Sequence, residues 1–162
     1  DVIIENNFQY IVSKLIDSDI NWELVRFLGK PKMLSYKQRK IFNLDGESNI
    51  VRIGNSPGGS YAYIISLNGA KKLLKSMDTV YLPPDILMGS PWITKIEVLV
   101  IMPSIATWDK NFHSSLDTAN RYNKKRDLSG LEIFVYPFTR LFFKLKIAFQ
   151  KRLYFYKHYY IP

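Results

Sequence analysis

The sequence predicts an α/β protein with a central mixed sheet, followed by a basic, amphipathic C-terminal helix. Residues 7–17 and 67–77 carry apolar side chains at helical spacing. Residues 93–102 read as a buried strand that ends at Pro103, and residues 98–102 of this stretch are all apolar. The 162 residues, 47% of them hydrophobic, suffice for one globular core.

Residues 1–5 read as the end of a buried strand and the loop after it. A domain rarely begins at such a point, so we expect the chain to be an N-terminally truncated part of a longer protein. Asn6 or Asn7 can cap the helix over 7–17. Residues 21–28 alternate like the next strand.

Local turn signals define the middle of the chain. Asp45-Gly46 predicts a hairpin between strands over 41–44 and 49–53. A β-rich stretch over 60–65 leads to Ser66, a suitable N-cap for the helix over 67–77.

Three further segments complete the predicted body. Within the helix over 67–77, Gly69-Ala70 suits close packing of helix on sheet. Leu82-Pro83-Pro84-Asp85 predicts a rigid turn into another helix. Residues 104–130 are polar, and we expect them to be irregular.

Composition excludes several classes of protein. The chain has no cysteine, which excludes a disulfide framework and a thiolate zinc site. Its two histidines are too few for a histidine-based metal site, and we interpret His113 as a solvated loop residue. The apolar runs are far shorter than the roughly 20 residues of a membrane-spanning helix.

The positive charge is concentrated at the C-terminal end. The net charge is +9, and residues 121–162 hold ten basic and two acidic residues. We therefore divide the chain into a domain over 1–120 and a basic tail over 121–162. Pro137 suits the first turn of a tail helix, whose apolar residues recur every three or four positions from Phe138 to Tyr156.

The tail has three interpretations. It could lie on an anionic membrane through Phe142, Lys144, Phe149, Lys151 and Arg152. It could bind nucleic acid by stacking and phosphate contacts, but the body shows no matching basic motif, so we expect no nucleic acid. It could also pack on the body as a core helix with its charged ends in solvent.

The most specific pattern lies over residues 59–74, Gly-Ser-Tyr-Ala-Tyr-Ile-Ile-Ser-Leu-Asn-Gly-Ala-Lys-Lys-Leu-Leu, followed by Pro83-Pro84-Asp85. It resembles glycosyltransferase family 25, the lipopolysaccharide (lipooligosaccharide) biosynthesis type. That family has a glycine, Ala-Tyr-(aliphatic)2-Ser, Gly-Ala, Leu-Leu and then Pro-x-Asp. Asp1-Val2 with Phe8, and Trp22 to Val25, match two further parts, so the resemblance covers about residues 1–115. The first two acids of the family's Glu-Asp-Asp motif are missing.

The resemblance implies a nucleotide-diphospho-sugar transferase (GT-A) fold and a metal site. Asp1 would hold Mn²⁺ or Mg²⁺, which neutralises the leaving diphosphate. The alternative for Asp1 is an exposed terminal aspartate. Gly59 would let the backbone approach the bound sugar or diphosphate, or simply form a loop turn. Tyr61 and Tyr63, on one face of a strand, would stack on a sugar or pack in the core.

Asp85 is the predicted catalytic residue, as the base that takes the proton of the acceptor hydroxyl or as an acceptor-binding group. Its alternative role is to cap the helix that begins near Ile86. The implied activity moves a hexose, galactose from UDP-galactose, onto lipooligosaccharide at the cytoplasmic face of the bacterial inner membrane. The alternatives are an inactive fragment and a membrane-surface module that acts through the tail.

Overall fold

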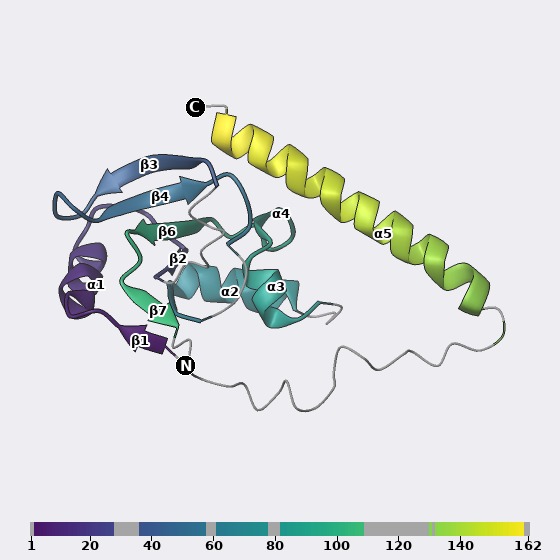
Figure 1. Ribbon diagram of the computed structural model, residues 1–162, viewed down its shortest axis with the longest axis horizontal. Helices are drawn as coiled ribbons and strands as arrows, with labels where there is room; N and C mark the ends of the chain where they lie inside the picture. Colours follow the sequence, from purple (N-terminus) through teal and green to yellow (C-terminus); the bar gives the residue numbers. More distant parts are fainter. Residues whose placement is uncertain are drawn as a thin grey trace.

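A five-stranded mixed sheet organises the protein (Figure 1). The computed structural model describes residues 2–27, 36–57, 61–77, 82–108, 130 and 132–160. The strands are β1 (Val2–Ile4), β2 (Leu24–Arg26), β3 (Gln38–Asn43), β4 (Asn49–Ile53), β5 (Tyr63–Ile65), β6 (Val98–Met102) and β7 (Ala106–Trp108). The helices are α1 (Phe8–Ile16), α2 (Leu67–Ser76), α3 (Pro84–Met88), α4 (Pro91–Thr94), α5 (Glu132–Phe155) and the π-helical turn η3 (Tyr156–Tyr160).

The strand order is β3-β4-β6-β2-β5, with β2 and β6 parallel and the other neighbours antiparallel. Strands β1 and β7 form a separate antiparallel pair. The described part of the chain is therefore mixed α/β, as the sequence predicts.

Side-chain alternation along β2 and β6 divides the core between the two faces of the sheet. Val25 and Leu99 join the cluster of α1, which contributes Ile11 and Leu15. Leu24, with Val98, packs instead against Met88 at the end of α3 and Ile96 after α4. Because successive residues of a strand point to opposite faces, helices cover both sides of the sheet.

Three local predictions are confirmed. The helix over 7–17 is α1, and the hairpin is β3–β4, with Gly46 at φ +97° in its turn. The side chain of Ser66 accepts a hydrogen bond from the Gly69 N–H at 3.1 Å and so caps α2.

Other boundaries differ from the predictions. Strand β6 begins at Val98 because Pro91 starts the short helix α4, which takes up Ile93. The predicted irregular segment after Ser104 contains β7. The prediction that the first strand is buried is wrong: β1 pairs only with β7, and Ile4 is 58% exposed.

The tail helix begins ahead of its proline. We expected Pro137 in the first turn, but α5 starts at Glu132 and includes it. The helix therefore gives up the backbone hydrogen bond that residue 137 would donate. Helix α5 is 24 residues, or about 36 Å, long. In Figure 1 it lies along one side of the body, and its N-terminal half extends away from it.

Gly69 allows the close approach of α2 to the sheet. A Cβ atom at this position would lie 2.5 Å from the carbonyl oxygen of Glu23. That distance is too short for any non-bonded contact, so the helix packs on β2 only with glycine here, as the sequence predicts.

Replacing Gly69 with alanine should therefore destabilise the protein by about 1–3 kcal/mol, the usual cost of overpacking. In an open helix the same change would stabilise by about 1 kcal/mol, so the sign of the effect is diagnostic. Urea unfolding measures it. Leu74→Ala, on the exposed side of α2, serves as the control and should change stability by only about 0.5 kcal/mol. Unchanged stability of Gly69→Ala would contradict the close contact.

Candidate functional site

Asp85 lies in the first turn of α3. Pro83 is the N-cap residue, Pro84 occupies the first helical position, and no side chain caps this helix. The alternative in which Asp85 caps the helix is therefore wrong. The two prolines fix the backbone that carries the Asp85 carboxylate.

A buried arginine interacts electrostatically with this carboxylate. Arg26, at the carboxyl end of β2, is 2% exposed, and its partner across the strands is Tyr63. Burial lowers the pKa of Arg26 to about 10, and the charge of Asp85, together with the Tyr63 phenol in its ionised form, opposes that shift. Arg26 stays protonated at neutral pH, so it places a positive charge at the carboxyl end of β2.

Asp85 lines a cavity of about 240 Å³ between α3, α4 and α5. Ser56 and Ser90 also line it, and α5 contributes Ile147 and Lys151. Both hydroxyls donate to backbone carbonyls, Ser56 to Gly89 and Ser90 to Ile86, which leaves their oxygens able to accept. The cavity thus combines a carboxylate, two hydroxyls and an ammonium group.

The structure brings together only some of the predicted site residues. Asp1 and Gly59 lie outside the described residues, as does His113. Tyr63 belongs to β5 and is 41% exposed, whereas Tyr61 precedes the strand and is 40% exposed. The expectation that both tyrosines lie on one strand is wrong, and neither is buried.

The sequence analysis did not predict Arg26, Ser56 or Ser90 as site residues. It assigned Lys151 only to a membrane contact. No local motif marks these residues, because they meet only through the tertiary fold. The one available signal is an arginine at the end of a strand that is otherwise apolar.

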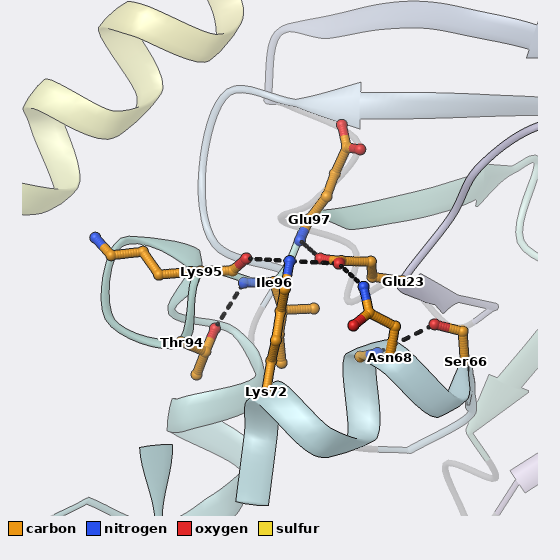
Figure 2. Close-up of polar contacts among 9 residues, drawn as sticks. Glu23, Ser66, Asn68, Lys72, Thr94, Lys95, Ile96 and Glu97 are labelled. Atoms are coloured by element: carbon orange, nitrogen blue, oxygen red, sulfur yellow. Dashed lines mark hydrogen bonds and ion pairs between the residues drawn. The ribbon is translucent and has the colours of Figure 1, made fainter. Parts of the chain in front are cut away.

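Glu23 joins β2, α2 and β6 (Figure 2). Its carboxylate accepts hydrogen bonds from Lys72 Nζ, from Asn68 Nδ2 at 2.9 Å and from the Glu97 N–H at 3.0 Å. Burial alone would raise the pKa of Glu23. The hydrogen bonds from Lys72 and Glu97 and the Lys72 charge outweigh burial and hold the pKa below its usual value of 4.5.

The C-terminal end of α5 contacts the body through aromatic and polar groups. Phe155 packs edge-on against Trp92, with ring centroids 6.0 Å apart. Arg52 donates to the His158 carbonyl at 3.2 Å and pairs with Glu97. Burial and the Glu97 charge raise the pKa of Tyr154 to about 12, against the opposing effect of Arg52.

The opposite side of α5 is apolar and exposed. We call it the α5 stripe. It consists of Phe134, Phe138, Leu141, Phe142, Leu145, Phe149, Leu153 and Tyr156, which are 43–74% exposed. At 100° per residue these positions share one side of the helix, whereas Phe143, Ile147 and Tyr154 lie on the other. Helix α5 therefore packs on the body through Phe155, as the core-helix interpretation expects, but this stripe stays exposed.

The described residues include no group of three or more histidine or acidic side chains that could hold a metal ion. They also include no helix that is long and apolar enough to cross a bilayer. Comparison of the chain with protein-family models, with curated proteins and with solved structures finds no match.

The Glu23 contacts predict a pH-dependent contribution to stability. Because the pKa of Glu23 is lower in the folded protein, this contribution is present above the unfolded value of 4.5 and is lost as pH falls through the folded value. Glu23→Gln should lower the free energy of unfolding by about 1–2 kcal/mol at pH 7. Urea titrations between pH 7 and pH 3 should show this difference shrinking below pH 4.5.

Glu47→Gln is the matched control, because Glu47 is exposed in the hairpin turn. It should change stability little at any pH. A Glu23→Gln deficit that stays constant down to pH 3 would contradict the ionised, hydrogen-bonded state of Glu23.

Proposed function

We propose that the protein is a hexosyltransferase of the family 25 type that works on a membrane surface. It would have a GT-A fold and transfer galactose from UDP-galactose to lipooligosaccharide at the cytoplasmic face of the bacterial inner membrane. The observation that carries this proposal is the cavity that joins the Asp85 carboxylate to Lys151 of α5, the helix that exposes an apolar stripe.

Asp85 would act on the acceptor. The acceptor hydroxyl oxygen attacks the anomeric carbon of the donor sugar, and the bond from that carbon to the diphosphate oxygen breaks. The hydroxyl proton passes to the Asp85 carboxylate, and UDP leaves. The resemblance implies inversion at the anomeric carbon in a single displacement.

A divalent ion, Mn²⁺ or Mg²⁺, would offset the charge that develops on the diphosphate. The resemblance assigns Asp1 to this ion and Gly59 to the donor, and both residues lie outside the described part of the chain. Tyr63, half-exposed and opposite Arg26, supports a sugar-stacking role.

Helix α5 would hold the protein on an anionic leaflet. Phe142 and Phe149 of its stripe are 70% and 69% exposed, and they would enter the acyl region of the membrane. Lys144 and Arg152 are exposed on the same helix and would meet lipid phosphates. Glu132 is the only acid between residues 130 and 162, so little opposes this attraction.

Asp85→Asn tests the catalytic role. UDP release is measured from UDP-galactose with Mn²⁺ and a water-soluble truncated oligosaccharide acceptor, and UDP-glucose and UDP-N-acetylhexosamines are tried in parallel. Acceptor-dependent release should fall by ~10²–10⁴-fold, because the general base is lost while the side-chain shape is kept.

Asp19→Asn removes the same charge from an exposed position after α1 and should leave the rate unchanged. Full activity of a folded Asp85→Asn variant would exclude Asp85 as the base. No release from any donor by the folded wild-type protein would contradict a transferase activity of this chain and would favour the inactive-fragment alternative.

A second candidate function, binding of an anionic membrane through α5 alone, is favoured by the exposed stripe. Vesicle co-sedimentation tests it with phosphatidylglycerol-containing and pure phosphatidylcholine vesicles. Phe142→Ser with Phe149→Ser should weaken binding to the anionic vesicles at least about tenfold, since burial of each ring contributes ~1.5–3 kcal/mol.

Ile3→Ser, at an exposed apolar residue of β1, is the control and should bind like the wild type. Equal binding to both kinds of vesicle would exclude the electrostatic part of the interaction. Unchanged binding of the double phenylalanine variant would exclude the stripe as the contact surface.

A further inference from the structure

Two neighbouring cavities lie between α4 and α5 and share Trp92, Ile93 and Ile147 in their walls. The smaller is the Asp85 cavity. The larger, about 450 Å³, is also lined by Lys95, Phe143 and Lys146. We call the pair the α4–α5 crevice. Their shared walls place the larger cavity next to the proposed reaction site.

The indole of Trp92 lines both cavities, and its N–H donates no hydrogen bond to a described residue. Trp92 is 9% exposed, and its Nε1–H has no acceptor among the described residues. A buried N–H without an acceptor costs free energy, and an oxygen atom of a ligand in the crevice would remove that cost. The indole therefore indicates a ligand that brings a hydrogen-bond acceptor.

The charges of the larger cavity favour an anion. Lys95 and Lys146 line it, and the described lining includes no acidic residue. Lys95 lies at the end of α4 and donates from Nζ to the Trp92 backbone carbonyl at 3.0 Å, which holds its ammonium group at the end of that helix. Lysine ammonium groups are common ligands of phosphate.

The rest of the larger cavity is apolar. Ile93, Phe143 and Ile147 form its walls, and Gln150 is its one uncharged polar side chain. A free phosphate ion would leave these walls uncovered, whereas a phosphate that carries a hydrocarbon chain would bury them. The α5 stripe lies on the other side of the same helix, so such a molecule could enter from a membrane beside α5.

We propose that the α4–α5 crevice binds a phosphate-bearing lipid, with the phosphate at Lys95 and Lys146, an oxygen at the Trp92 Nε1–H and the start of the chain against Phe143 and Ile147. The lipid is then the carrier of the acceptor sugar, whose free end reaches Asp85. That acceptor role rests on the proposed transferase activity. Binding of the lipid phosphate does not.

The test monitors the NMR signal of the Trp92 indole N–H and does not depend on enzymatic turnover. In the ¹⁵N-labelled chain, the three tryptophans give three indole N–H signals, and Trp92→Phe identifies the one that disappears. Titration with hexyl phosphate should move that signal downfield in a saturable way. Inorganic phosphate and hexanol at the same concentrations should move it much less.

Lys146→Gln should raise the Kd for hexyl phosphate about tenfold, because a charge-assisted contact is lost. Lys71→Gln, at an exposed lysine of α2 outside the crevice lining, should leave it unchanged. An unmoved Trp92 signal would overturn the proposal, as would equal effects of Lys146→Gln and Lys71→Gln. An equal response to inorganic phosphate would show an anion site without lipid selectivity. An equal response to hexanol would show a cavity that binds only apolar groups. Either result would overturn the proposal.

The transferase assay and this titration test separate claims, so one claim can be excluded while the other is kept. A saturable Trp92 shift without sugar transfer would keep the lipid-phosphate site and remove only its acceptor role. Sugar transfer without any Trp92 shift would keep the transferase and exclude the crevice as its lipid site.

Discussion

The placement of Glu23 is the constraint on which the rest of the structure depends. Its backbone carbonyl accepts from the Ser66 N–H at 2.9 Å and lies against Gly69, while its carboxylate holds Lys72 and the Glu97 backbone. One residue thereby fixes α2 on the sheet and aligns β2 with β6. Arg26, three residues further on, interacts electrostatically with Asp85 from its place in β2.

The body and the tail are joined through a second polar group that depends on the first. Glu97, whose N–H donates to Glu23, pairs with Arg52, and Arg52 donates to the His158 carbonyl beyond α5. The Trp92–Phe155 contact adds apolar area at the same place. The tail helix is therefore attached to the body near its C-terminal end, next to the cavity that it helps to form.

Local signals in the sequence predicted much of the fold. Ser66, Gly69 and Asp45-Gly46 each act within a few residues, so their roles are legible without a structure. Helix α4 was missed because Ile93 and Thr94 fit either a helix or the following strand. The strand order was not predictable, since β2 pairs with β6 across more than 70 residues of chain.

The candidate site was predicted only in part, for the same reason. Asp85 follows from its prolines and from the resemblance, but its neighbours Arg26, Ser56 and Lys151 come from three separate segments. The spacing of Phe138, Leu141 and Phe142 predicted an apolar side of α5. It did not say which side meets the body, because Phe143 and Ile147 continue the apolar surface around the helix.

Because one side of α5 faces the body and the other is exposed, only certain lengths of the helix keep both sides in place. One added residue turns everything N-terminal to it by about 100° and shifts it by about 1.5 Å relative to the attached end. The stripe would then no longer lie on the side of α5 away from the body, and part of it would face the body. Insertions or deletions of about seven residues keep the phase nearly intact, because two helical turns contain 7.2 residues. Chains that share this architecture should therefore vary the length of the helix in steps of about seven residues.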